Sequence, residues 1–335
     1  MKFAIKYYFL PKKDPRLLSK KNKCIIFMAA NYGNYGDIAI TESQKKYLKD
    51  LFPNYDIISY DIKESIYYLK MISRTITSND IITIIGGGNF GDTYMPFERT
   101  RRYIVKKLKK FNIISFPQTI SFSSKIELNK SLHTYKNSKL VVAVREGKSY
   151  STYKKIFKKM ILVPDIVLYN SVEHRKKNIT GKIAFIFRDD KEKSTEDSSI
   201  TELYNVAKQY GEIFHFDTTF PVKDSFDNHS ILTSFLDYVA TFDFIFTDRL
   251  HAMIFGYILN IPTVVLDNAN GKIGATYETW LNESERVFYI GNKWDNLLKE
   301  ELVNFITNAH EKKDNDDLKC YFNRLTDVIY QQVKY

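Results

Sequence analysis

FDFIFTDRLHAMIFGYILNIPTVVLDNAN, residues 242–270, is the stretch that decides the fold of this chain. An apolar run ends at Thr247, DRLH follows at residues 248–251, a helical pattern comes next, and a second apolar run, TVVL, closes the stretch. This order predicts a strand, a loop, a helix and a strand. In a parallel sheet such a loop opens at the carboxyl edge, where ligands bind, and the helix directs its positive N-terminus there. Arg249 and His251 at this junction therefore indicate an anion site.

Strand and helix patterns alternate along the chain, on both sides of a polar stretch at residues 170–182. Apolar runs such as KCIIF and DIITIIG precede helical patterns, as is typical of an open parallel sheet. A length of 335 residues allows two domains. We therefore expect an α/β protein with an N-terminal domain over residues 1–172 and a C-terminal domain with the DRLH motif over residues 173–335.

Net charge bears on the kind of binding partner, and cysteine content bears on disulfides, zinc and location. The 50 Lys and Arg against 39 Asp and Glu give a net charge of +11, which suits an anionic small molecule, a membrane surface, nucleic acid or a merely solvated surface. We expect no nucleic acid, because no binding module is present and the basic helix predicted at residues 99–110 has only Tyr103 as an interleaved aromatic. Two cysteines argue against a disulfide framework or a zinc site and fit a cytoplasmic location.

The N-terminal segment, MKFAIKYYFLPKKD, has a short apolar patch that Lys6 interrupts and Pro11 ends. It is too short for a signal peptide, and no apolar run in the chain reaches the roughly 18 residues of a spanning helix. Its basic and aromatic residues suit a membrane surface. We therefore expect a cytoplasmic protein whose residues 1–22 contact the inner face of the plasma membrane, a hypothesis that vesicle binding can test.

Two glycine-rich loops follow predicted strands, NYGNYGD at residues 31–37 and GGGNFGD at residues 86–92. Asp37 and Asp92 each follow a glycine, where a carboxylate can bind sugar hydroxyls or remove a proton. For Asp37, capping the next helix is an equal alternative. The second loop has the G-x-G-x-x-G spacing but lacks the acidic residue expected about 20 positions later, at the end of the next strand, because that strand, NIISF, is expected to end at Pro117. A backbone cradle for a sugar or phosphate is therefore favoured over a nicotinamide site.

Arginines and one histidine at strand ends are further candidates. Arg249 offers a planar fork for carboxylate or phosphate, and His251 can exchange a proton near neutral pH or play a structural part. Arg145 ends a strand in the first half and is either a second cation of the site or the ion-pair partner of Glu146; Arg188 is a third candidate. Metal-ligand spacings, a G-x-S-x-G elbow and a GK[ST] loop are all missing, so we expect neither a metal nor a cofactor.

Motifs spread over residues 24–285 resemble those of the polysaccharide pyruvyl transferase family. They are NYGNYGDIAI, GGGNFGD, PQTI, VREGKSY, PDIVL and, most specifically, TDRLHAMIFGYILNIPTVVLDNANGKIG. The resemblance implies a GT-B-like fold, with two Rossmann-like domains facing across a cleft and the N-terminal domain on the acceptor side. It also implies transfer of pyruvate from phosphoenolpyruvate onto two hydroxyls of a sugar or lipid-linked oligosaccharide, which leaves a pyruvate ketal, in exopolysaccharide or capsule biosynthesis.

The resemblance assigns roles to individual residues. Arg249, Leu250 and His251 match residues that contact phosphoenolpyruvate, and Arg145 matches an arginine from the other side of the cleft. We expect His251 to donate a proton or to stabilise the phosphate. The remaining candidates lie in the two glycine-rich loops: Asp37 or Asp92 for acceptor activation, and Asn31, Gly88 and Asn89 for substrate binding.

Two alternatives stay open at this stage. A GT-B glycosyltransferase could use the same basic junction to hold the diphosphate of a nucleotide sugar. A non-catalytic protein of a polysaccharide-assembly complex could keep the fold without the reaction.

Overall fold

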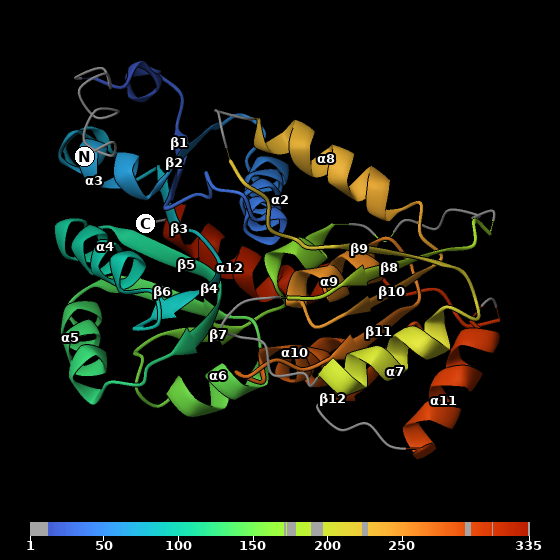
Figure 1. Cartoon of the computed structure of the whole chain (residues 1–335). Helices are drawn as coiled ribbons and strands as arrows, with labels where there is room; N and C mark the ends of the chain where they lie inside the picture. Colours follow the sequence, from blue (N-terminus) through green and yellow to red (C-terminus); the bar gives the residue numbers. More distant parts are fainter. Residues whose placement is uncertain are drawn as a thin grey trace.

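The computed structural model describes residues 13–170, 172, 179–188, 197–222, 227–291, 296–309 and 311–333. They form two parallel β-sheets flanked by helices, one in each half of the chain (Figure 1). The predicted α/β architecture, with two Rossmann-like domains facing across a cleft, is confirmed. No helix in these ranges is long and apolar enough to cross a membrane. Residues 1–12, which hold most of the predicted membrane-contacting segment, lie outside the described residues.

The first sheet has the strand order β2-β1-β3-β5-β6-β7, and β4 lies alongside β5. All of its pairings are parallel. β1 and β3 are buried over their full length, which accounts for their nearly continuous apolar sequences. The strands are β1 Lys23–Phe27, β2 Asp56–Tyr60, β3 Ile81–Ile84, β4 Gly87–Gly91, β5 Asn112–Ser121, β6 Lys139–Val144 and β7 Met160–Leu162.

Helices cover both faces of this sheet: α2 Tyr35–Leu51, α3 Ile62–Thr75, α4 Met95–Lys107, α5 Lys125–Lys136 and, after β6, α6 Gly147–Tyr153. Because β-α-β crossovers are right-handed, the reversal of strand order at β1 places α2 on one face and α3, α4 and α5 on the other. Helix α2 begins earlier than its apolar period suggests, since the side chain of Asn34 accepts the N–H groups of Gly36 (2.9 Å) and Asp37 (3.3 Å). The cap of α2 is therefore Asn34, and Asp37 lies in the first turn with its carboxylate left for another role.

The second sheet has the order β12-β11-β10-β8-β9, again parallel throughout. The strand, loop, helix and strand predicted for residues 242–270 are confirmed as β10, α9 and β11. The strands are β8 Lys182–Ile186, β9 Glu212–Phe216, β10 Phe244–Thr247, β11 Thr263–Leu266 and β12 Val287–Gly291. The helices are α7 Asp197–Ala207, α8 Asn228–Val239, α9 Leu250–Ile258, α10 Lys272–Thr276, the π-helical turn η4 Tyr277–Leu281 and α11 Asn296–Thr307.

Two local predictions are wrong. The GGGNFGD segment is not a loop throughout, because β4 pairs with β5; a Cβ on Gly91 (φ 141°) would lie 1.7 Å from the carbonyl oxygen of Ser121, so only glycine fits there. The strand expected to end at Pro117 continues as β5. Proline donates no hydrogen bond, and the register between β5 and β6 shifts between Ser115 and Gln118 to accommodate it.

The C-terminal helix α12, Asn323–Val333, returns to the first domain. Its Thr326 hydroxyl lies 2.8 Å from the hydroxyl of Tyr47 in α2, and Leu325 and Ile329 are buried in the core that includes β1 and β3. The predicted division of the chain at 172/173 places this helix in the second domain, whereas its contacts are with the first.

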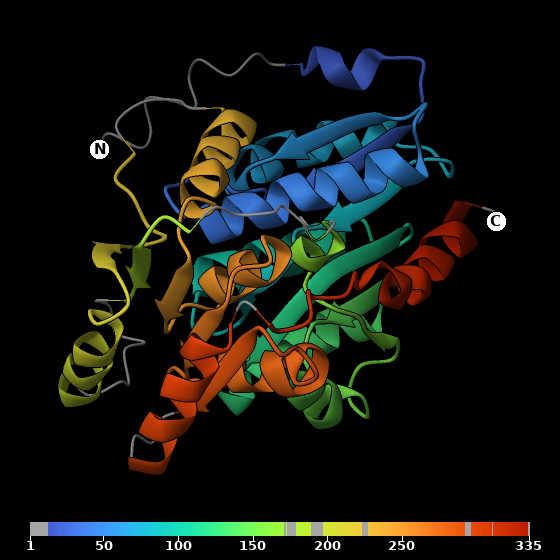
Figure 2. The same ribbon diagram turned by 90° about the vertical axis from the view of Figure 1, so that its right-hand side faces the viewer.

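The two domains are joined by direct contacts beside the cleft. Helices α2 and α8 lie side by side, as Figure 2 shows in blue and gold. The ring of Tyr35 stacks on Phe235 with centroids 3.7 Å apart, and its N–H donates to the carbonyl of Thr218 (2.9 Å). Asn34 and Thr219 form an isolated antiparallel bridge. The loops that follow β1 and β9 are therefore fixed against each other.

Strand order reverses once in each sheet, between β1 and β3 and between β8 and β10. In open α/β sheets, ligands bind outside the carboxyl ends of the strands at such a reversal. The loops after these four strands face one another between the domains, and this is where the site lies.

Candidate active site

A cavity of about 520 Å³ lies between the two points of strand reversal. Its lining comes from segments that follow strands of both sheets, as expected for a ligand site in this class of fold. Most of the predicted site residues line it: Asn31, Asp37, Gly88, Asn89, Arg145, Arg249, Leu250, His251 and the third cationic candidate, Arg188.

The junction between β10 and α9 is held by one threonine. The hydroxyl of Thr247 donates to the carbonyl of Ile186 in β8 (2.6 Å) and accepts the N–H of Arg249 (2.9 Å). Within the described chain no side chain caps α9, whose N-cap residue is Arg249. The first N–H groups of this nine-residue helix are therefore available to an anion in the cavity.

Buried carboxylates connect the strand ends of the second sheet. Asp248 is fully buried and accepts the N–H of Arg188 (2.9 Å), which fixes the end of β8 to that of β10. Burial raises the pKa of Asp248 to about 6, against the lowering effect of this hydrogen bond and of the nearby arginine charges. Asp217, directly after β9, accepts a 2.6 Å ion-pair contact from Nη2 of Arg249. The guanidinium of Arg249 is thus held in one orientation.

His251 extends from the second domain to the first. A Cβ on Gly36 would lie 2.2 Å from its Nδ1, so the imidazole packs directly on the backbone at the start of α2. Its Nε2 is buried, lies 3.7 Å from Oδ2 of Asp165, and makes no hydrogen bond within the described part of the chain. This nitrogen is available to a group bound in the cavity.

Arg145 is held from both domains. It is 1% exposed, contacts Oδ2 of Asp165 at 2.6 Å and donates from Nε to the hydroxyl of Thr119 (2.9 Å). Trp280 of the second domain donates to its carbonyl (2.7 Å). The predicted alternative, an ion pair with Glu146, is replaced by the pair with Asp165, because the Glu146 carboxylate accepts the Ser149 hydroxyl (2.5 Å).

Asp165 therefore lies between Arg145 and His251. Burial alone would raise the pKa of this carboxyl, but the adjacent His251 and the charge of Arg145 outweigh it and hold the pKa well below its ordinary value. Its Oδ1 also accepts the N–H of Val167 (2.9 Å). One buried carboxylate thus links a cation of the first domain to the histidine of the second.

The loops of the first domain complete the cavity. Asp37 is half-buried and adjoins Gly87, where a Cβ would lie 3.8 Å from its Oδ1. A Cβ on Gly88 would lie 3.4 Å from Nη2 of Arg145, so the exposed backbone of β4 borders this guanidinium. Asn89 is held by Arg101, which donates to its side-chain and backbone oxygens. Asn89 is therefore anchored to α4 where the glycine segment lines the cavity.

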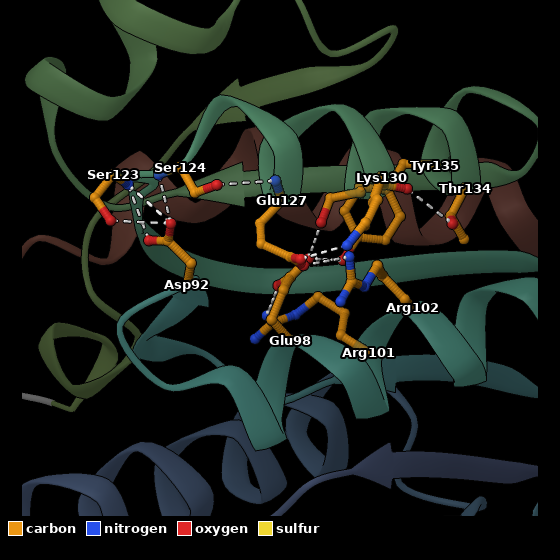
Figure 3. Close-up of polar contacts among 11 residues, drawn as sticks. Asp92, Glu98, Arg101, Arg102, Ser123, Ser124, Glu127, Lys130, Thr134 and Tyr135 are labelled. Carbon is orange, nitrogen blue, oxygen red and sulfur yellow. Dashed lines mark hydrogen bonds and ion pairs between the residues drawn. The ribbon is translucent and has the colours of Figure 1, made fainter.

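Asp92 lies apart from this group. Its carboxylate accepts the N–H groups of Ser123 (2.9 Å) and Ser124 (2.6 Å) and the hydroxyl of Ser123 (3.0 Å), so it joins the end of β4 to the start of α5 (Figure 3). Partial burial would raise the pKa of Asp92, but these hydrogen bonds lower it. Its carboxylate oxygens are engaged by these local donors, and Asp92 does not line the cavity.

Three charged residues at the site were not predicted: Asp165, Asp217 and Lys272. Asp217 directly follows β9 and so carries the same strand-end signal as Arg249. Asp165 comes three residues after β7, within the PDIVL motif, and the same signal could have found it. Lys272 lines the cavity from the start of α10, where the sequence offers no comparable signal.

The fold and the site define a class of protein: a two-domain, GT-B-like α/β protein with a cation-lined cavity between its domains. Solved structures share this architecture. The UDP-GlcNAc 2-epimerase of Methanocaldococcus jannaschii superposes with a TM-score of 0.51 at 12% identity, covering 92% of this chain and 99% of that one.

Sequence relatives define the family more closely. General stress protein 30 of Bacillus subtilis is 32% identical over an alignment of 333 residues, which covers 95% of this chain and 95% of that one. Pyruvyl transferase 1 of Schizosaccharomyces pombe is 28% identical over an alignment of 287 residues, which covers 75% of this chain and 68% of the yeast protein. The family model for polysaccharide pyruvyl transferase matches residues 34–270. The chain belongs to the polysaccharide pyruvyl transferase family, and this membership makes it a transferase.

Proposed function

We propose that the protein transfers pyruvate from phosphoenolpyruvate to two hydroxyls of a sugar, forming a pyruvate ketal in bacterial exopolysaccharide or capsule biosynthesis. The observation that carries the proposal is the pair of fixed arginines at one cavity, Arg145 from the first domain and Arg249 from the second. Phosphoenolpyruvate has two anionic groups, a carboxylate and a phosphate. Two oriented guanidinium groups match that number, and no cofactor takes part.

In this proposal the phosphate binds at the second domain. Arg249 and the first N–H groups of α9, at Leu250 and His251, are suited to it by charge and by donor geometry. The carboxylate binds to Arg145 beside the exposed backbone of Gly88. This arrangement leaves the double bond of the donor between the domains, near Nε2 of His251.

The reaction then needs one proton at carbon and two new C–O bonds. His251 donates a proton to the methylene carbon, which leaves an oxocarbenium-like centre at C2. A first sugar hydroxyl adds to C2 and gives its proton to Asp37; phosphate leaves with the electrons of the C–O bond, and the second hydroxyl closes the ketal. Asp37 passes its proton to the departing phosphate, and the proton of the second hydroxyl restores His251, so the charges and atoms balance. Fixed cations around the moving charge supply most of the stabilisation.

Asp165 acts as a positioning residue in this scheme. Its Oδ2 lies 2.6 Å from the guanidinium of Arg145 and 3.7 Å from Nε2 of His251. One carboxylate therefore orients both residues that are proposed to contact phosphoenolpyruvate. Asp37 is preferred over Asp92 for acceptor activation because Asp37 lines the cavity, whereas Asp92 is engaged by Ser123 and Ser124.

The acceptor is proposed to enter from the first domain. Tyr32, Tyr94 and Phe97 line that side of the cavity and give apolar faces against which sugar rings can pack, while Asn31 and Asn89 offer polar groups for hydroxyls. These features suit a sugar or a lipid-linked oligosaccharide.

A ligand titration followed by an activity measurement tests the proposal. Phosphoenolpyruvate should raise the unfolding temperature, because it binds only the folded state, and UDP-sugars should not. Inorganic phosphate should then appear only when a sugar acceptor is added. Stabilisation by nucleotide sugars alone would support a glycosyltransferase instead. Binding of phosphoenolpyruvate with no phosphate release across an acceptor panel would support the non-catalytic alternative.

A further inference from the structure

The positive charge of the chain is concentrated in one segment. Residues 99–159 contain 17 Lys and Arg against 2 Asp and Glu, while the rest of the chain contains 33 against 37. This segment runs from α4 through α5 and α6 to the start of β7. The net charge of +11 is therefore a property of one part of the first domain and not of the whole surface.

Much of this charge reaches one continuous surface. One hollow lies between α4 and α5, and a second lies between α5 and residues 155–159. His133 lines both of them. Around them lie five exposed lysines, which we call the basic surface: Lys106, Lys136, Lys155, Lys158 and Lys159. No ion pair is found for any of the five within the described ranges.

The acidic residues nearby do not neutralise the basic surface. Glu127 is engaged by Arg102 (2.9 Å) and Lys130 (2.7 Å), as Figure 3 shows. Glu98 is fully buried and paired with Arg101 at 2.6 Å. The remaining acidic residue of the segment, Glu146, is also buried, at the cleft. The five lysines therefore present their charge to solvent or to an external partner.

Apolar side chains accompany the lysines. Ile126 is 68% exposed, Ile156 is 45% exposed and Tyr103 is 42% exposed. Ile126 precedes Lys130 and His133 by four and seven positions on α5, so it lies on the same helix face. Exposed aliphatic groups among lysines suit a bilayer, in which charges meet anionic headgroups and apolar groups enter the interface. They do not suit nucleic acid, which is bound by stacking on aromatic rings or by helices that fit a groove.

We propose that the basic surface docks the protein on an anionic lipid bilayer. Helix α4 connects this surface to the cleft: Pro96 and Phe97 in its first turn line the cavity, and Lys106 lies in its last turn. Its 13 residues span about 20 Å, so docking would hold the cleft within reach of molecules embedded in the same membrane. The docking does not depend on the reaction proposed above.

Vesicle flotation of the full chain tests this inference. We expect binding to vesicles of phosphatidylcholine with phosphatidylglycerol, and none to vesicles of phosphatidylcholine alone. The triple variant Lys155→Gln, Lys158→Gln, Lys159→Gln should bind the anionic vesicles roughly a hundredfold more weakly, because each lysine near the surface contributes about fivefold to the affinity. A matched triple variant on the second domain, Lys208→Gln, Lys299→Gln, Lys313→Gln, should change binding little. All these side chains are exposed, so unfolding temperatures should stay unchanged.

A second pair of variants separates a bilayer from other polyanions. Ile126→Ser with Ile156→Ser should weaken vesicle binding several-fold and leave heparin binding unchanged. Three results would overturn the proposal: equal losses in the two triple variants, vesicle binding that does not respond to the isoleucine variants, or binding that disappears on deleting residues 1–12 but survives in the Lys155 triple variant. The last result would assign docking to the N-terminal segment.

Discussion

The cleft and the basic surface both collect positive charge, but they hold it in opposite ways. In the cleft, Arg145 and Arg249 are almost fully buried, and each is fixed by a carboxylate at 2.6 Å. On the basic surface, Lys155 and Lys158 are exposed, and no ion pair holds them in the described chain. Guanidinium groups held in one orientation suit a small anion of defined geometry, whereas exposed lysine ammonium groups suit an extended, variable surface. The kind of partner follows from how a charge is held and not from how many charges there are.

The largest effect on catalysis should come from replacing Arg249, because the fold tolerates its loss better than that of Arg145. Arg249→Ala should lower kcat/KM for phosphoenolpyruvate by about 10²- to 10³-fold, because a charge-assisted contact to the donor is lost. Its partner Asp217 is 28% exposed and can be solvated, so the unfolding temperature should fall little.

Arg286→Ala is the matched control for that variant. Arg286 also pairs with one partly exposed carboxylate, Asp314 at 2.8 Å, but it does not line the cavity. Steady-state kinetics of the two variants should differ sharply. Equal, small effects would mean that the cleft arginine is only structural.

Asp165→Asn tests whether one carboxylate sets both sides of the donor site. We expect kcat to fall about 10- to 100-fold, since Arg145 and His251 lose their common partner, with a loss of stability of about 3 to 5 kcal/mol from the broken buried pair. The depressed pKa of Asp165 means that its stabilisation is present above the ordinary carboxyl pKa and is lost as the pH falls.

Unfolding free energies of the wild type and Asp165→Asn should therefore converge toward low pH. A kcat that stays at the wild-type value while stability falls would leave Asp165 as a purely structural residue.

Gly36→Ala tests the contact between the domains at His251. The added methyl would lie 2.2 Å from Nδ1, so the imidazole must move, and kcat should fall about tenfold. In a His251→Ala background the same change should have almost no further effect, because the two act through one contact. Additive losses in this double-mutant cycle would place the effect of Gly36 elsewhere.

Asp248→Asn addresses stability rather than catalysis. Because the pKa of Asp248 is raised to about 6, its contribution is most favourable in acid and is lost as the pH rises through 6. An asparagine can still accept the N–H of Arg188 without a buried charge. The variant should therefore be more stable at pH 7.5, by up to about 3 kcal/mol, with a flatter pH profile between 4 and 6. Denaturant unfolding at several pH values measures this, and a lower stability at pH 7.5 would contradict it.

The smallest effect is expected on the basic surface. The Lys155, Lys158, Lys159 triple variant should turn over a water-soluble sugar acceptor at the wild-type rate, because these side chains do not line the cavity. Equal kcat and KM in the absence of vesicles would keep the two cationic regions functionally separate. A large loss of kcat in the absence of vesicles would mean that the basic surface contributes to the reaction in the cleft.

The sequence predicts elements well where one local rule decides them. The β10, α9, β11 succession follows from apolar runs and helical spacing, and Arg249 and His251 follow from their place at a strand end. The β4 strand could not be predicted, because five residues rich in glycine form a strand only through pairing with β5. Asp165 and His251 are 86 positions apart in sequence and meet only because the two domains pack together. The role of Asn34 as the cap of α2 was hidden by Asp37, which fits the same rule.

Mass spectrometry of the acceptor after incubation in D2O tests the central claim most directly. With phosphoenolpyruvate and a reactive sugar, the wild type should add one pyruvate ketal carrying deuterium in its methyl group, and His251→Ala should form it far more slowly. A product that carries a glycosyl unit, or a ketal whose methyl group gains no deuterium, would contradict the account of phosphoenolpyruvate bound between Arg145 and Arg249 and protonated at carbon.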